Sequence, residues 1–404
     1  ICYSKTLYFR KKNSWQLPAL VVKYSADMPA FFATHHAGVP ERQGFALKPA
    51  QKLMETMQLA QNAAVVVHNP SNMFYLTGGY TGEGVVYISR ETQAIITDFR
   101  YTEQAGRQAP DFRCVMVEKG LNHDQWVAKL AHGENVTMLY YEDDYLTVKA
   151  FDALRAAVGE GADWQPLAQK PEKLREIKTV AEAHCIREAC RITAAAFVKM
   201  LPEIHEGMTE KQLAIRLDFL QLELGAQCNS FDTICASGEN GSLPHAIPGE
   251  RKVRKGDLIT FDFGCKVGGY CSDMTRTVAL GEPSAEMRRV YDTVLEAQRM
   301  GREALAPGKS CFEIDKLVRD YIDSQGYAGR FGHGLGHAVG IDIHENPRLS
   351  TGCHDIVEVG HVLTVEPGIY IPGLGGVRIE DTCLVTESGN DPLTGAAPKE
   401  LIIL

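Results

Sequence analysis

The chain has 404 residues, a net charge of −9 and eleven cysteines. Its length predicts one large domain or two ordinary ones, and its 45% hydrophobic and 23% charged residues are typical of a globular protein with a sizeable core. The acidic balance disfavours nucleic acid as a partner, because a duplex-binding surface needs a basic stripe. The sequence has no apolar run of eighteen residues, so we also expect no membrane-spanning helix and no membrane partner.

The cysteines and the first residues indicate the cellular compartment of the protein. The cysteines are odd in number and form no C-x-x-C pair, so a disulfide framework is disfavoured and a cytoplasmic protein with reduced thiols is expected. Residues 1–44 begin with Ile rather than Met and lack the long apolar run of a signal peptide. We therefore treat residues 1–44 as a leader of uncertain status.

Residues 45–170 have the alternating pattern of an α/β unit. A helix is predicted over residues 48–62, and three apolar strand-like runs separated by Asn, Pro and Gly follow it up to residue 98. A further strand is predicted at residues 136–143 and a further helix at residues 145–158. Strands that alternate with helices indicate a smaller α/β domain.

After a predicted connector over residues 163–179, the rest of the chain combines helices with hairpins. Two of the predicted helices open with capping-box patterns, Thr209 with Gln212 and Ser310 with Glu313. Strand-like stretches such as "DLITFDFGC" and "HVLTVEPGIYI" lie between and after the helices, so an α+β domain is expected over residues 171–404. The four helices are predicted at residues 179–204, 208–224, 284–305 and 310–326.

Two aspartates lie in a predicted hairpin, "LITFDFGCKVGGYCSDMTRTV". If the hairpin is centred on Val267 and Gly268, Asp262 and Asp273 lie opposite each other. Like charges directly across two strands repel, and a carboxylate in an apolar strand is costly unless a cation compensates it. The alternative is that a bulge offsets the pair and that one aspartate faces solvent.

The same feature occurs twice more in this half of the chain. Glu366 ends the apolar run "VLTVEP", and Glu380 lies in "GVRIEDTCLV". Each alone is compatible with a capped or exposed carboxylate at the end of a strand. Four carboxylates in four apolar strands favour a shared cation site.

Three histidines lie in the glycine-rich segment "FGHGLGHAVGIDIHE". His333 and His337 are four residues apart, but the glycines disfavour a helix. The stretch "HENPR" that begins at His344 does not match an H-E-x-x-H motif. The alternatives are structural histidines in a turn or an ordered loop that presents imidazoles to the carboxylates. Four carboxylates with one imidazole suit Mn²⁺ or another divalent ion, and enough carboxylates are present to hold two.

The motifs resemble those of the dinuclear metallopeptidases with the pita-bread fold, which include methionine aminopeptidase, prolidase and aminopeptidase P. "NPSNMFYLTG" and "TDFRYTEQA" in the first half are similar to the creatinase-type N-terminal domain, which favours the Xaa-Pro branch. The resemblance implies an α+β pita-bread catalytic domain at 171–404, preceded by a smaller α/β creatinase-type domain at 45–170. The motifs that carry it in the second half are "DFG", "CSDMTRT", "GHGLGHAVGIDIHE", "VLTVEPGIYIPG" and "GVRIEDT".

The resemblance also implies a ligand set for two divalent metal ions, Mn²⁺ first, with Co²⁺ or Zn²⁺ as alternatives. Asp262 and Glu380 would be shared by both ions. Asp273 would serve one ion, and His337 with Glu366 the other. Glu366 would in addition carry the proton from the attacking water to the leaving amine.

Four more residues have substrate or positioning roles by resemblance. His245 resembles a histidine that contacts the substrate, and His333 and His344 resemble the two that line the prolyl pocket. Arg378 resembles the arginine near the metal centre. His361 stands where Met is usual, and we expect it to be a surface residue at the start of a strand.

The resemblance implies a hydrolase of proline-containing peptides, and we favour an Xaa-Pro aminopeptidase. The near alternative is Xaa-Pro dipeptidase, or prolidase, which cleaves only dipeptides. More distant alternatives are a lyase or a binding protein on the same fold, although a binding protein predicts broken ligand positions. Relatives of this fold are usually homodimers, so a homodimer is expected.

Overall fold

The structure, a computed structural model, describes residues 47–118 and 120–404. The predicted leader, residues 1–44, lies outside the described residues. Within the described ranges, none of the helices combines the length and the apolar character that crossing a bilayer requires.

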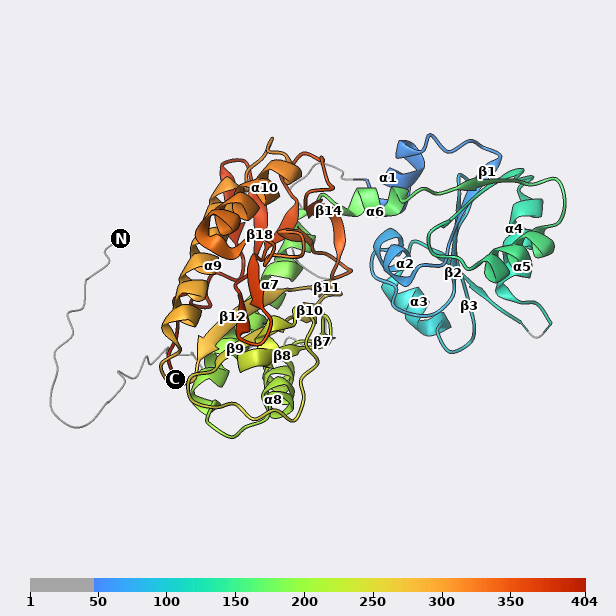
Figure 1. The fold of residues 1–404 in the computed structure, drawn as a ribbon. Helices are drawn as coiled ribbons and strands as arrows, with labels where there is room; N and C mark the ends of the chain where they lie inside the picture. Colours follow the sequence, from blue (N-terminus) through green and yellow to red (C-terminus); the bar gives the residue numbers. More distant parts are fainter. Residues whose placement is uncertain (1–46, 119) are drawn as a thin grey trace, which may run out of the picture. The chain divides into compact units, whose positions relative to one another are not determined.

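The helices and strands follow one another in the order that Figure 1 labels. The helices are α1 (Pro49–Thr56), α2 (Pro70–Thr77), α3 (Thr102–Gln108), α4 (His123–Gly133), α5 (Val148–Val158), α6 (Lys170–Arg175), α7 (Val180–Met200), α8 (Glu210–Glu223), α9 (Ala285–Ala304) and α10 (Cys311–Ile322). Short helical turns are η1 (Leu201–Glu203), η2 (Gly238–Ser242) and η3 (Asp323–Tyr327). The strands of the first half are β1 (Ala63–Val67), β2 (Val85–Ser89), β3 (Gln93–Thr97), β4 (Arg113–Met116), β5 (Met138–Tyr141) and β6 (Asp163–Pro166).

The N-terminal half forms one mixed six-stranded sheet in the order β4-β3-β2-β1-β5-β6. All five residues of its central strand β1 are buried. Because alternate residues of a strand point to opposite sides, both faces of the sheet are covered at β1. Val65 and Val67 pack in a cluster with residues of α1, α2 and α3, whereas Ala64 and Val66 pack with residues of α4 and α5. The predicted α/β unit is therefore present.

The C-terminal half contains four small sheets rather than one. They are ordered β11-β10-β7, β12-β9-β8, β14-β13-β15-β18-β19 and β16-β17. Helices α9 and α10 lie side by side along these strands in Figure 1. The strands are β7 (Cys228–Asn229), β8 (Ile234–Ser237), β9 (Leu258–Phe263), β10 (Cys265–Val267), β11 (Tyr270–Cys271), β12 (Met274–Ala279), β13 (Gly336–Ala338), β14 (Glu345–Leu349), β15 (Val362–Val365), β16 (Gly368–Ile371), β17 (Gly375–Arg378), β18 (Asp381–Thr386) and β19 (Gly389–Pro392).

The hairpin register differs from the predicted one. Asp262 lies opposite Thr275, not Asp273, because the turn is centred on Gly268 and Gly269, both of which adopt positive φ. The hairpin also changes sheet part-way, since β9 and β12 pair in one sheet and β10 and β11 in another. The change occurs at Gly264, where an added Cβ would lie 1.9 Å from the carbonyl oxygen of Ser272.

Three local expectations have mixed outcomes. The Thr209 capping box is present, since Thr209 and Gln212 exchange hydrogen bonds at the start of α8. Ser310 is the N-cap of α10, but its side chain makes no capping hydrogen bond, so the second box is wrong. The predicted connector contains β6 and the short helix α6, because its first residues pair with β5 in the N-terminal sheet and residues 170–175 form a short helix.

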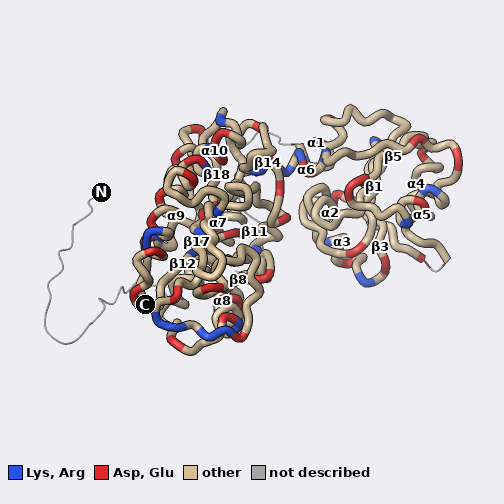
Figure 2. The backbone as a smooth tube through the Cα atoms, in the orientation of Figure 1, with Lys and Arg blue, Asp and Glu red and all other residues tan. Residues whose placement is uncertain are grey.

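Charged residues are spread over both halves. Figure 2 shows Lys and Arg positions interspersed with Asp and Glu positions along the described backbone. The expectation that nucleic acid is not a partner stays a prediction.

Candidate metal centre and active site

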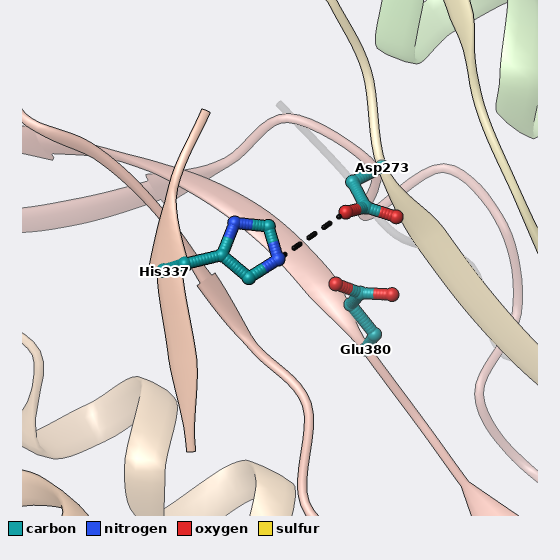
Figure 3. Close-up of side chains that lie close together, drawn as sticks. All are labelled: Asp273, His337 and Glu380. Atoms are coloured by element: carbon teal, nitrogen blue, oxygen red, sulfur yellow. Dashed lines mark ion pairs between the residues drawn. The ribbon is translucent and has the colours of Figure 1, made fainter. Parts of the chain in front are cut away.

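Three of the five predicted metal ligands converge on one point. Ligand atoms of Asp273, His337 and Glu380 all lie within 4.8 Å of one another, and the three side chains are buried. Asp273 precedes β12, His337 is in β13 and Glu380 lies between β17 and β18, so three separate segments supply the group. Figure 3 shows the three side chains pointing toward one another. Nε2 of His337 lies 3.5 Å from Oδ2 of Asp273.

The other two predicted ligands line the same cavity, whose volume is about 680 Å³. Glu366 follows β15, and its Oε1 lies 3.3 Å from Nε2 of His337. Asp262, in β9, forms an ion pair of 2.6 Å with Nη2 of Arg378. All five predicted ligands therefore surround one cavity. Asp273, His337 and Glu380 are the three whose ligand atoms all lie within 4.8 Å of one another.

The carboxylates are crowded in a way that favours a cation. Burial raises the pKa of Asp273 well above its usual value, and the neighbouring charges of Glu380, Asp262 and Glu366 add to that increase. Burial and neighbouring carboxylates raise the pKa of Glu380 in the same way. Oδ1 of Asp262 and Oε1 of Glu380 are buried without a hydrogen-bond partner. Oxygen atoms left in this state, next to an imidazole, fit a site for divalent metal ions.

Glu366 differs from the other carboxylates of the group. Burial alone would raise its pKa, but the hydrogen bond and the charge of His337 outweigh burial and lower the pKa to about 2. Thr364 donates a further hydrogen bond to Oε1 of Glu366 at 3.1 Å. Glu366 is thus held as an anion at the end of β15.

The three other predicted histidines also line the cavity. His333 is bonded through Nε2 to the hydroxyl of Tyr370 at 2.8 Å, and the ring of His344 meets that of His337 edge to face. Burial lowers the pKa of His333, and it lowers the pKa of His344 to about 4, with help from the charges of His337 and Arg348. The imidazoles of His333 and His344 are therefore neutral near pH 7. His245 is on an exposed loop at the cavity.

Arg378 is buried, lines the cavity and links several of these groups. Its Nη2 bonds to Asp262, its Nη1 to the hydroxyl of Tyr370 at 2.8 Å, and its Nε to Oγ1 of Thr275 at 3.1 Å. Thr275 in turn donates to Oε2 of Glu380 at 2.8 Å. One arginine thus holds both carboxylates that are predicted to be shared.

Sequence reasoning did not single out Tyr370 and Arg348. Tyr370 lies in the quoted motif "VLTVEPGIYIPG", and a tyrosine in an aliphatic strand only four residues after the predicted ligand Glu366 was a usable signal. Arg348, which lines the cavity, follows the histidine segment by three residues but has no distinctive local pattern. His361 corrects an expectation, because it is buried with 2% exposure rather than on the surface.

Comparison with known proteins adds the family. The model of metallopeptidase family M24 matches residues 184–387, and that of the creatinase/prolidase N-terminal domain matches residues 49–177. The chain belongs to metallopeptidase family M24. As a member of this family it is a hydrolase with a creatinase-type N-terminal domain and a pita-bread catalytic domain, and the family implies divalent metal ions. The domain boundaries at residues 44 and 170 stay a prediction.

Three proteins illustrate what this M24 peptidase is similar to. It is 41% identical to the uncharacterized peptidase YqhT of Bacillus subtilis, over 86% of this chain and 97% of that protein. An Xaa-Pro dipeptidase structure from Bacillus anthracis has a TM-score of 0.84 at 40% identity, covering 88% of this chain and 99% of that one. An X-Pro aminopeptidase structure from Thermotoga maritima has a TM-score of 0.81 at 32% identity, covering 87% and 100%.

Proposed function

We propose that this M24 peptidase is an Xaa-Pro dipeptidase. The observation that carries the proposal is the likeness to the Bacillus anthracis dipeptidase at 40% identity, against 32% for the Thermotoga maritima aminopeptidase. The sequence motifs alone favoured the aminopeptidase, and the comparisons support the alternative, a dipeptidase, better. Arg348 gives independent support, because a cation on the cavity wall suits the free carboxylate that the proline of a dipeptide carries.

Five residues would hold two divalent metal ions. Asp262 and Glu380 would be shared, Asp273 would serve one ion, and His337 with Glu366 the other. The unpartnered oxygens of Asp262 and Glu380 support this assignment, as does the chemistry of four carboxylates with one imidazole, which suits Mn²⁺, Co²⁺ or Zn²⁺. When bound, such ions polarise a carbonyl group and make water a nucleophile at neutral pH.

The protein's own groups would handle the proton and the substrate. Glu366 would accept a proton from the attacking water and deliver it to the proline nitrogen as the peptide bond breaks. His344, which is neutral near pH 7, would donate or accept a hydrogen bond to the prolyl residue or its carbonyl without adding charge. Both ring nitrogens of His333 already bond, to the carbonyl oxygen of Gly334 and to the hydroxyl of Tyr370, so its neutral ring would line the prolyl pocket. His245 on the exposed loop would contact the substrate from the other side.

A proline peptide bond suits a cavity of this kind. Proline lacks the backbone N–H that a general peptidase binds, so recognition has to come from elsewhere. Phe231 and Ile343 give the cavity apolar wall area for the ring. Asp262 and Arg378 give the same cavity polar groups beside the proposed metal ligands, where the bond to be broken would sit.

Two other functions remain as alternatives. An Xaa-Pro aminopeptidase would act on longer peptides, and a lyase would act on a small molecule that is not a peptide. A metal-free binding protein is disfavoured, because all five predicted ligands surround one cavity. The homodimer and the cytoplasmic location stay predictions.

The test is product analysis with Mn²⁺ on three peptides: an Xaa-Pro dipeptide, an Xaa-Pro-Yaa tripeptide and an Xaa-Ala dipeptide. We expect cleavage of the Xaa-Pro dipeptide, with the tripeptide and the Xaa-Ala control largely spared. Preferred cleavage of the tripeptide would restore the aminopeptidase assignment. If protein with its full metal content cleaved none of the three, the Xaa-Pro assignment would be wrong.

A further inference from the structure

A buried arginine connects the N-terminal domain with the loop that carries His344. Arg175, at the end of α6, is 4% exposed, and its Nη2 lies 2.6 Å from Oδ2 of Asp342. The same nitrogen also bonds to Glu345. Nη1 donates to Oδ1 of Asn72, a fully buried residue of α2, at 2.9 Å. A single side chain therefore contacts residues of α2, of the loop that carries His344 and of β14.

Both carboxylates in this cluster are held from a second side. Oγ of Ser71, also in α2, donates to Oδ1 of Asp342 at 2.6 Å. Nζ of Lys178 lies 3.0 Å from Oε2 of Glu345, and the side chains of this pair are only 1% and 7% exposed. Burial alone would raise the pKa of Glu345, but the charges of Lys178 and Arg175 outweigh burial and lower it. The cluster is thus a set of compensated charges rather than a chance surface contact.

The two anchored carboxylates enclose two residues of the cavity wall. Ile343 and His344 lie between Asp342 and Glu345 in the sequence, and both line the cavity. The side chain of Glu345 folds back over the preceding loop, where the backbone N–H of Asp342 donates to its Oε1 at 3.2 Å. A Cβ added at Gly340 would lie 2.3 Å from Oε2 of the same carboxylate. The loop therefore packs closely around the Glu345 carboxylate, whose charge Arg175 compensates.

We propose that Arg175 is a positioning residue for His344, and that Ser71 and Asn72 make the N-terminal domain part of this positioning. A ring that contacts the substrate has to be held within a fraction of an ångström, and a network of charge-assisted hydrogen bonds around the buried Arg175 and the partly exposed Asp342 provides such a restraint. The inference rests on the proposed function, in which His344 contacts the prolyl residue. The competing explanation is that Arg175 only joins two parts of the chain.

The main variants are Arg175→Met, which removes the charge, and Arg175→Lys, which keeps the charge but loses the fork geometry. The matched control is Arg251→Met, which breaks the partly buried ion pair of 2.6 Å between Arg251 and Asp257, neither of which lines the cavity. Each metal-loaded variant is assayed for kcat and KM on an Xaa-Pro dipeptide. Hydrogen–deuterium exchange of residues 340–345 is measured on the same proteins.

We expect Arg175→Met to lower kcat/KM by about 10- to 100-fold, the usual cost of misplacing a catalytic group, and to speed exchange in residues 340–345. Arg175→Lys should recover part of both effects, and Arg251→Met should change neither. A folded Arg175→Met with the kcat/KM and the loop exchange of the control would overturn the inference. Because the exchange measurement needs no turnover, it still tests the positioning if the wild-type protein fails to cleave Xaa-Pro.

If Arg175→Met does not fold, Ser71→Ala tests the same inference with a smaller change. It removes only the hydrogen bond from α2 to Asp342. Faster exchange in residues 340–345 together with a lower kcat would support the inference. Wild-type exchange and wild-type kcat in this variant would contradict it.

Discussion

Nη2 of Arg378 lies 2.6 Å from Oδ2 of Asp262, whereas Oδ1 of the same carboxylate is buried without a hydrogen-bond partner. Glu380 repeats the arrangement, since Thr275 donates to its Oε2 and its Oε1 has no partner. The protein thus satisfies one oxygen of each proposed shared carboxylate and leaves the other oxygen for a cation. Because Arg378 also donates to Thr275, it orients both carboxylates.

Arg378→Lys should therefore weaken metal binding as well as catalysis. A lysine cannot reach Asp262, Thr275 and Tyr370 together, and loss of such outer-shell partners typically costs about 10- to 100-fold in metal affinity or activity. The measurement is metal content after dialysis against graded chelator, combined with kcat/KM at saturating Mn²⁺. Wild-type affinity and activity in the variant would show that Arg378 does not orient the ligands.

Removing divalent metal should abolish activity and lower the thermal unfolding midpoint. Without cations, the crowded carboxylates of Asp273, Glu380 and Asp262 repel one another, and an ion that binds only the folded state stabilises it by mass action. Activity and the midpoint are measured after chelation and after adding back Mn²⁺, Co²⁺ or Zn²⁺ separately. Full activity in protein shown by elemental analysis to be free of metal would disprove the metal centre.

Glu366→Gln should lower kcat by about 10²- to 10⁴-fold, the usual contribution of a positioned proton-transfer group. The amide keeps the shape of the side chain but cannot accept the proton. Metal content has to be measured in parallel, because the proposal also makes Glu366 a ligand. A variant that binds its full metal complement and turns over at the wild-type rate would show that the proton takes another route.

Arg348→Met should raise the KM for an Xaa-Pro dipeptide by about tenfold, which corresponds to about 1.4 kcal/mol of binding free energy. The matched substrate is the Xaa-Pro amide, which has no carboxylate for Arg348 to bind. Its hydrolysis should be poor in the wild-type protein and unchanged in the variant. An equal effect of the substitution on both substrates would mean that Arg348 does not recognise the carboxylate.

His361 should make stability depend on pH. Burial lowers the pKa of its imidazole from 6.5 to about 4, and the charges of Lys178 and Lys173 act in the same direction. The folded state therefore favours the neutral ring, so this contribution is complete above pH 6.5 and is lost as the pH falls from 6.5 to 4.

His361→Met should reduce the slope of unfolding free energy against pH in this window by up to about 1.4 kcal/mol per pH unit, the value for one proton. Denaturant unfolding at a series of pH values measures it. The matched control is His184→Gln, which removes an exposed histidine and should leave the slope unchanged. An unchanged slope in His361→Met would mean that this ring does not contribute.

Patterns of neighbouring residues predicted the helices and strands well, but they predicted poorly which distant residues lie opposite or in contact with each other. The Thr209 capping box and the α/β pattern of the first half depend on residues close in sequence, and both are present. The position of Asp273 relative to Asp262 depended on which two glycines form the turn, and a shift of one residue moved the register. The crowded carboxylates were predictable because an apolar strand makes each of them costly.

Contacts between distant segments could not be predicted from the sequence. Arg175 and Glu345 are 170 residues apart, and nothing local marks them as partners. His361 was misjudged for the same reason, since the start of a strand is often exposed and only the folded chain buries this one. The choice between dipeptidase and aminopeptidase likewise depends on how the cavity receives the far end of a substrate, which motifs shared by both activities do not encode.

The close approach at Gly264 has a consequence for how this chain can vary. The obstacle is the Ser272 carbonyl oxygen at the Cβ position itself, so it excludes alanine as firmly as any larger residue. A saturation scan of the hairpin should therefore accept only glycine at position 264. The two aspartates on either side of it, Asp262 and Asp273, should instead be sensitive because their replacement disturbs the proposed metal centre. Loss of function at three nearby positions would then have two separate origins, which protein abundance measured beside activity would distinguish.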